Sequence, residues 1–146
     1  MKKFAALVLA LLLLLSYACA EVIPEVVISF RTENGEEAVL EAQLFDTEAA
    51  RALAAMENPV FLMADLNGEE KFAYLPQALT ESPELMETVK AGDILLFGNK
   101  CLVIFYQDAV TAFGYTPIGR ILNPEMLPQL LGEGDVQVTF LFDEVK

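Results

Sequence analysis

Two extended apolar segments joined by an Asn-Gly turn are the feature that most constrains the fold of this chain. Residues 26–32 (VVISFRT) alternate inward and outward side chains with a period of two, and residues 37–45 (EAVLEAQLF) follow soon after Asn34-Gly35. A period of two is typical of a β-strand with one buried face. Asn-Gly between two such segments is a strong signal for a tight hairpin turn. The sequence therefore predicts an antiparallel hairpin over residues 26–45.

The same pattern continues along the chain. We expect further hairpins over residues 60–75 and 93–107, and single strands at residues 118–122 and 135–145. These segments give about eight strands, mostly in hairpin order. Antiparallel strands with few helices favour a closed or nearly closed barrel, so the predicted fold class is mainly β.

Two short segments have the spacing of helices. Residues 46–56 (DTEAARALAAM) place apolar side chains on one helical face, and Asp46 or Thr47 suits the N-cap. Residues 123–134 (NPEMLPQLLGEG) begin with Asn123 as the expected N-cap and have proline at the first helical position. We expect these two helices to cover the ends of the barrel.

Two remaining segments have no clean period. Residues 75–89 contain two prolines and are expected to form a long connection, with a short helical turn as an option. Residues 108–117 are expected to form a loop that carries Phe113 and Tyr115.

The first twenty residues have the pattern of a secretory signal peptide. Two lysines precede an unbroken apolar run over residues 4–15, and Ala18-Cys19-Ala20 matches the small-x-small cleavage pattern. The apolar run is short for a membrane span. We therefore expect residues 1–20 to be removed on export, leaving a barrel domain of residues 21–146 that is secreted or held in the cell envelope, without a membrane span.

The cysteines leave one alternative open. Cys19 follows Ala18, as a lipoprotein acceptor cysteine would, and lipid attachment there would anchor the protein to a membrane. The residues before it fit that pattern poorly, so removal of Cys19 is the preferred interpretation. Cleavage after Ala20 leaves Cys101 as the sole cysteine, and no internal disulfide can then form.

Charge and the lack of histidine exclude several classes of function. The chain has 9 basic and 22 acidic residues, a net charge of −13, and loss of two lysines with residues 1–20 leaves seven basic residues and a charge of −15. A nucleic-acid partner would need clustered Lys and Arg. Without histidine, Ser-His-Asp and Cys-His catalysis and the usual zinc sites are excluded. We expect no metal and no cofactor.

Five motifs follow one another in a specific order: TEAARALAAM, LNGEEKFAYLPQAL, KAGDILLFG, LVIFYQD and YTPIGRI. This order resembles that of the bacterial cyclophilin-like fold proteins, over about residues 26–142. The resemblance implies a small closed barrel of eight antiparallel strands capped by two short α-helices. The strand count made from the residues alone agrees with it.

The resemblance to the true cyclophilins, which are peptidyl-prolyl isomerases, is weaker. KAGDI (90–94) is similar to their Gln-Gly-Gly-Asp-Phe run, but Lys90 stands in the place of the active-site glutamine. Their essential arginine falls at Ser82, and their pocket histidine falls about at Tyr115, while Phe105 matches a pocket-floor aromatic residue. Prolyl isomerisation needs a cation near the proline amide. These departures favour a protein that is not an enzyme.

Six side chains are the predicted ligand-binding residues. Aromatic residues in a loop are better site candidates than those on alternating strands, which more often belong to a core. An arginine between apolar residues offers an anchor for a carboxylate, although a salt bridge is the simpler interpretation. The predicted set is Phe61, Met63, Phe105, Phe113, Tyr115 and Arg120, and Phe72 is a further aromatic candidate.

Three functions remain open from the sequence. The leading hypothesis is an exported, monomeric and non-catalytic protein that binds a small molecule or an extended peptide in a barrel-side groove. The alternatives are a prolyl isomerase that assists folding in the cell envelope, and a structural or protein-interaction module. The pattern Asp65-x-Asn67-Gly68-Glu69 is faintly similar to a calcium loop, but its Asn-Gly pair is explained by the hairpin.

Overall fold

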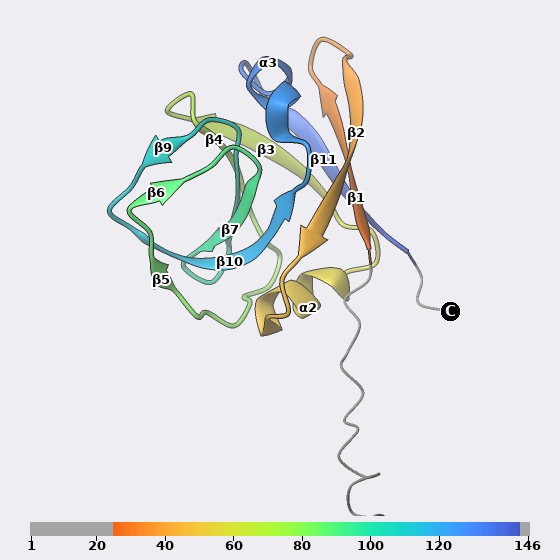
Figure 1. Ribbon diagram of the computed structural model, residues 1–146. Helices are drawn as coiled ribbons and strands as arrows, with labels where there is room; N and C mark the ends of the chain where they lie inside the picture. Colours follow the sequence, from red (N-terminus) through yellow and green to blue (C-terminus); the bar gives the residue numbers. More distant parts are fainter. Residues whose placement is uncertain (1–24, 144–146) are drawn as a thin grey trace, which may run out of the picture.

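Eight antiparallel strands pair in a ring in the computed structural model, which describes residues 25–143 (Figure 1). The order around the ring is β2-β1-β11-β3-β4-β8-β7-β10, and β10 returns to pair with β2. The strands are β1 (Val26–Thr32), β2 (Glu37–Leu44), β3 (Val60–Leu66), β4 (Glu70–Tyr74), β7 (Asp93–Phe97), β8 (Cys101–Phe105), β10 (Gly114–Ile121) and β11 (Val136–Phe142). The predicted closed eight-stranded barrel is confirmed.

The three predicted hairpins form between consecutive strands. β1 pairs with β2, β3 with β4, and β7 with β8, each in antiparallel register. In the β3–β4 turn, Asn67 and Gly68 both have positive φ angles, of 57° and 66°. Asparagine and glycine enter this region of backbone space most readily, which is why this dipeptide predicts a tight turn.

The barrel core continues into a helix at each end (Figure 1). α2 (Glu48–Ala54) contributes Ala49, Ala50 and Leu53 at one end, and the Oγ1 of Thr47 accepts a hydrogen bond from the Ala50 N–H at 3.1 Å. A 3₁₀ turn (η1, Pro124–Met126) and α3 (Leu127–Leu130) cover the other end. Asn123 stands at the N-cap position with Pro124 after it, as expected, but its side chain makes no capping hydrogen bond and the helix begins as a 3₁₀ turn.

The two segments expected as connection and loop contain short strands instead of a helical turn. β5 (Glu84–Leu85) pairs with the start of β10, and β6 (Thr88–Val89) pairs with β9 (Ala109–Val110). We call β5, β6 and β9 together the outer flap, since they lie outside the ring (Figure 1). Tyr115 consequently belongs to β10 and not to a loop.

The N-terminal predictions fall outside this structure. The expected signal peptide and Cys19 lie before the first described residue. Within residues 25–143, no helix has the length and apolar character needed to cross a membrane.

The ring closes at Gly119, where β10 meets β2. Gly119 is in register with Leu44, next to a register shift on the β7 side of the same strand. A Cβ atom on Gly119 would lie 2.4 Å from the carbonyl oxygen of Gln43 and 3.1 Å from the Cα of Leu44. Real Cβ atoms do not approach backbone atoms so closely, so this pairing needs a residue without a side chain.

We expect Gly119→Ala to weaken the closure and to lower the free energy of unfolding by about 3 kcal/mol, because the backbone of β2 must shift. Gly114→Ala is the matched control in the same strand, since a Cβ there meets atoms at 3.5 Å or more. Urea unfolding followed by circular dichroism measures both variants. Equal stability of the two variants would contradict a steric requirement at Gly119.

Candidate functional site

A second apolar cluster lies on the outer face of the barrel. Strands β4, β7, β8 and β10 turn alternate apolar side chains outward, and the outer flap covers them. This outer cluster consists of Val89, Leu95, Val103, Phe105 and Tyr115, with Phe72, Met86, Cys101 and Ala109 packed against it. It is separate from the barrel core, so these strands are apolar on both faces.

Four aromatic rings lead from the outer cluster to the protein surface. The ring centroids are 5.9 Å apart for Phe105 and Tyr115, 5.7 Å for Tyr115 and Phe97, and 5.6 Å for Phe97 and Phe113. Phe105 and Tyr115 are buried, whereas Phe97 is 44% exposed and Phe113 is 58% exposed. Tilted and edge-to-face contacts of this kind favour aromatic packing. A ring from a ligand could extend the series at its exposed end.

Glu70 faces the same outer surface from β4. It is the cross-strand partner of Phe105 on β8 and of Leu66 on β3. Burial, together with the negative charges of Glu69 and Asp65, raises the pKa of the Glu70 carboxyl to about 7. No residue described in the structure gives this carboxylate a hydrogen bond or an ion pair. The side chain is a half-buried, uncompensated acid at the edge of an aromatic surface.

Cys101 and Tyr115 carry the other polar atoms of the outer cluster. Burial raises the pKa of the Cys101 thiol, and the charge of Glu70 adds to that effect. Burial likewise raises the pKa of the Tyr115 phenol. A thiol that resists ionisation is a poor nucleophile, so Cys101 serves here as a small packing group.

The structure brings together three of the six predicted ligand residues. Phe105, Phe113 and Tyr115 belong to the series of rings on the outer face. Phe61 and Met63 point into the barrel core, where the ring of Phe61 packs edge-on against a neighbouring phenylalanine. Core packing explains these two residues without a ligand.

Arg120 lies apart from the outer cluster. It is exposed on β10, and its cross-strand neighbours are Gln43 and Asp93. Its guanidinium makes no ion pair with any carboxylate between residues 25 and 143. The salt bridge favoured from the sequence is therefore not formed with the described residues.

The positions matched to the isomerases bring no free cation to the outer cluster. Ser82 has no charge, and its backbone N–H donates to the Oγ1 of Thr116 at 2.9 Å. The ammonium of Lys90 is exposed and pairs with Asp108 at 3.2 Å. The arrangement offers apolar rings and an acid, which suits binding better than polarisation of an amide.

Glu70, Phe97 and the outer flap were missed by the reasoning from sequence. The alternation of Glu70 with Phe72 in EKFAY could have revealed an acid on an apolar face. That signal was ambiguous, because both faces of these strands are buried and periodicity does not say which one faces outward.

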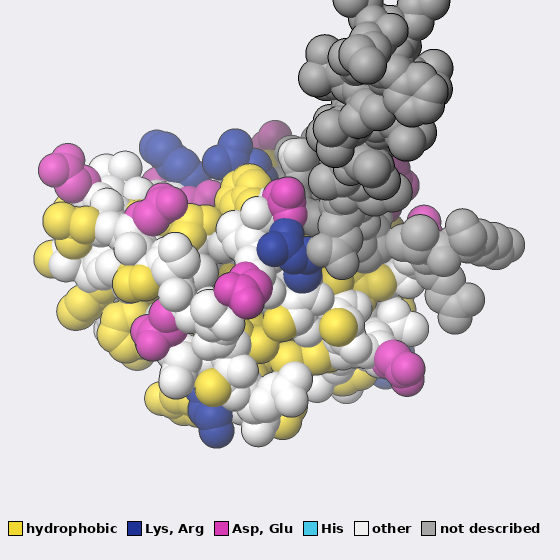
Figure 2. All heavy atoms as spheres, turned by 90° about the horizontal axis from the view of Figure 1, so that it is seen from below, with side chains coloured by type: hydrophobic (Ala, Val, Ile, Leu, Met, Phe, Trp, Pro, Cys, Tyr) yellow, Lys and Arg dark blue, Asp and Glu magenta, His cyan; other side chains and the backbone are white. Residues whose placement is uncertain are grey.

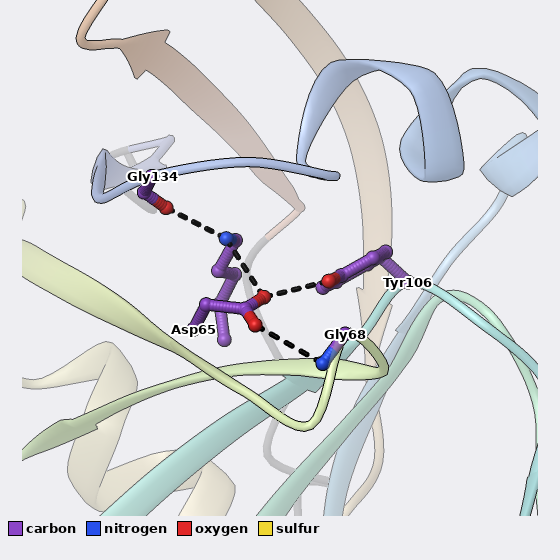
Figure 3. Close-up of polar contacts among 5 residues, drawn as sticks. Asp65, Gly68, Tyr106 and Gly134 are labelled. Atoms are coloured by element: carbon purple, nitrogen blue, oxygen red, sulfur yellow. Dashed lines mark hydrogen bonds and ion pairs between the residues drawn. The ribbon is translucent and has the colours of Figure 1, made fainter.

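Lys71 and Tyr106 are buried at the α3 end of the barrel and join a polar cluster with Asp65, Gly68 and Gly134, which lie at the surface (Figure 3). Its side chain is 0% exposed, and its Nζ donates to the Oδ1 of Asp65 at 3.0 Å and to the carbonyl oxygen of Gly134 at 2.7 Å. The hydroxyl of Tyr106 donates to the same Asp65 oxygen at 2.6 Å, and the Gly68 N–H donates to the other oxygen. The cluster ties together the β3–β4 hairpin, the end of β8 and the segment before β11.

The contacts of Asp65 in this cluster also bear on the weak similarity of this segment to a calcium loop. Burial alone would raise the pKa of Asp65, but hydrogen bonds from Tyr106 and Lys71 outweigh it and lower the pKa. The carboxylate is thus already occupied by an ammonium group. In residues 25–143, no group of three potential metal ligands comes together.

A groove of about 820 Å³ lies at the opposite end of the barrel, where β1 begins and β2 ends. Four acids, Glu25, Glu41, Asp46 and Asp143, line it beside apolar residues. Figure 2 looks onto this end and shows acidic side chains interspersed with hydrophobic ones. None of the predicted ligand residues lines this groove.

We expect Asp65→Asn to destabilise the protein more than Lys71→Met. The first change leaves a fully buried ammonium without its counter-ion, at a cost of about 3 kcal/mol. The second leaves a carboxylate that still reaches water and keeps Tyr106 and Gly68 as donors, at a cost of about 1 kcal/mol. Urea unfolding at neutral pH measures both, and the reverse order would argue against the Lys71 cluster.

The raised pKa of Glu70 makes stability depend on pH. Because the pKa of this carboxyl is about 7 in the folded protein and ordinarily 4.5, the folded protein holds the proton more tightly. The free energy of unfolding therefore falls as pH rises between these values, and stays low above them. We expect Glu70→Gln to remove this slope and to gain about 1–2 kcal/mol at about pH 8, less than the full shift implies because water screens the group.

Thermal unfolding at a series of pH values measures this effect. Glu36→Gln, at an exposed site on the β1–β2 turn, is the matched control with the same change in charge. A Glu70→Gln variant that keeps the parent's slope between pH 4.5 and 7 would show that another group causes it.

Comparison with solved structures finds proteins that share the fold of this barrel. The structure of McbB in complex with tryptophan has a TM-score of 0.54 to this chain and 14% sequence identity. The match covers 82% of this chain but 45% of the McbB chain, so this chain spans less than half of that protein. The solution structure of the hypothetical protein AF2241 from Archaeoglobus fulgidus has a TM-score of 0.55 and 20% identity, covering 85% of this chain and 99% of that one. At these identities the likeness shows a shared fold.

The family assignment comes from the sequence. A search of curated proteins gives no significant match. The family model described as the Cyclophilin-like family matches residues 34–141, which is most of the barrel. This chain therefore belongs to the Cyclophilin-like family.

Proposed function

We propose that the protein is an exported, non-catalytic binding protein whose ligand site is the outer cluster. The ligand is a small molecule or an extended peptide that carries an apolar ring. The observation behind this proposal is the series of four rings, which runs from buried Phe105 to exposed Phe97 and Phe113.

Exposure of aromatic rings supports a site at this position. Exposed apolar patches on soluble proteins often mark binding surfaces. Phe97 and Phe113 lie beside the outer flap, whose Leu85 and Val110 are also strongly exposed. Leu85 pairs with Gly114, the residue after Phe113, and so adds apolar surface at the exposed end of the series of rings.

The weak attachment of the outer flap supports access to the buried rings. β5, β6 and β9 have two residues each, so few backbone hydrogen bonds hold them. Short pairings at the surface open locally at lower free energy than the barrel strands do. A ligand ring can then reach Phe105 and Tyr115 without opening the barrel.

Two further observations bear on ligand class and location. McbB, which shares the fold, has been determined in complex with tryptophan, and this supports indole compounds as first probes. The lysines, apolar run and Ala18-Cys19-Ala20 pattern within residues 1–20 support export.

Titration with N-acetyl-tryptophanamide, followed by NMR, tests the site. We expect saturable shifts in the ring signals of Phe97, Phe113 and Tyr115. Phe113→Ala removes an exposed contact, so it should weaken binding about fivefold while changing the melting temperature little. Val39→Ala, which truncates an exposed side chain on β2, is the control and should leave affinity unchanged. Shifts confined to other parts of the barrel would contradict the proposed site.

A further inference from the structure

We propose that Glu70 is the anionic end of this site, so that the protein selects ligands carrying a protonated amine beside their aromatic or apolar group. This inference rests on the proposed function and names the chemical class of its ligand.

Glu70 lies between apolar residues of the two neighbouring strands. The register places it directly between Leu66 on β3 and Phe105 on β8. Phe72, two residues along the same strand and so on the same face, packs against the outer cluster. The carboxylate is therefore set in an apolar surface beside Phe105, at the buried end of the series of rings.

None of residues 25–143 supplies a counter-ion to the Glu70 carboxylate. The acidic groups that act on it are Glu69 in the β3–β4 turn and Asp65 on β3, and its own charge acts on Cys101 of β8 and Tyr115 of β10. Lys71, its neighbour in sequence, points into the barrel and is held by Asp65. A half-buried carboxylate without a partner is unfavourable, and a cation from outside would relieve that cost.

An ammonium group next to a ring matches both features of this surface. The carboxylate offers a charge-assisted hydrogen bond, and the faces of neighbouring rings attract a cation. A ligand with a carboxylate would instead be repelled by Glu70, Glu69 and Asp65. The surface thus discriminates by charge among ligands with the same ring.

Titration of Glu70 should make the affinity for a cationic ligand depend on pH. Its pKa of about 7 lies well below that of an alkyl amine, so above pH 7 the acid is ionised while the amine stays protonated. Affinity for a cationic ligand should therefore rise with pH through about 7 and then level off. Affinity for a neutral ligand with the same ring should change little.

Three probes with one indole ring test this: tryptamine (cation), tryptophol (neutral) and indole-3-propionate (anion). Binding to the purified protein is measured by calorimetry and NMR at about pH 8.5 and pH 5.5. At the higher pH we expect tryptamine to bind about tenfold more tightly than tryptophol, and indole-3-propionate more weakly than either. The preference for tryptamine should shrink at the lower pH.

Two variants locate the effect. Glu70→Gln should remove the preference for tryptamine over tryptophol and its pH dependence. Glu41→Gln makes the same charge change in the 820 Å³ groove and should have no effect. Loss of tryptamine binding in Glu41→Gln, with Glu70→Gln unaffected, would overturn the inference by placing the cation in that groove.

The inference and the proposed function fail in different ways. If tryptophol shifts the ring signals of Phe113 and Tyr115 but tryptamine binds no better above pH 7, the role of Glu70 is refuted and the site stands. If none of the three probes shifts those signals, the proposed ligand site itself is refuted.

Discussion

The pairing of β2 with β10 is the contact on which the rest of this structure depends. It turns an open sheet into a ring, and it requires the backbone of Gly119 to lie against the Gln43 carbonyl group. Closure gives the inward side chains a single shared core, which helices cover at both ends. The same strand, β10, pairs with β5 at Gly114 and Tyr115 and with β7 from Thr116 onward, so it joins the ring to the outer flap.

Strands β4, β7, β8 and β10 contribute alternate residues to the barrel core and to the candidate site. On β8, Ile104 belongs to the barrel core and Phe105 to the outer cluster. On β4, Lys71 turns inward and is fully compensated, whereas Glu70 turns outward and is not. Because successive side chains of a strand point to opposite faces, two adjacent charged residues have opposite consequences here. Substitutions at inward and outward positions of these strands can thus separate effects on stability from effects on the proposed ligand site.

Local signals explain what could be predicted from the sequence. The Asn-Gly turns and the Thr47 cap act over a few residues, and the structure has both. Long-range pairing explains what could not be predicted. β10 begins at Gly114 because it pairs with β5 and β7, partners that no local pattern identifies. Phe61 and Phe105 looked equivalent in sequence, since continuous apolar segments do not reveal which face a side chain occupies.

The proposed ligand would link binding to stability through Glu70. An ionised carboxylate set among Leu66, Phe72 and Phe105 lowers the stability of the folded protein, because water hydrates it better in the unfolded chain. The Lys71 cluster shows that this fold can compensate a charge fully where the charge serves the barrel itself. A ligand ammonium that binds only the folded state would supply the missing compensation and stabilise the protein by mass action. An acid left uncompensated beside a series of aromatic rings is therefore better explained by a ligand than by the needs of the fold.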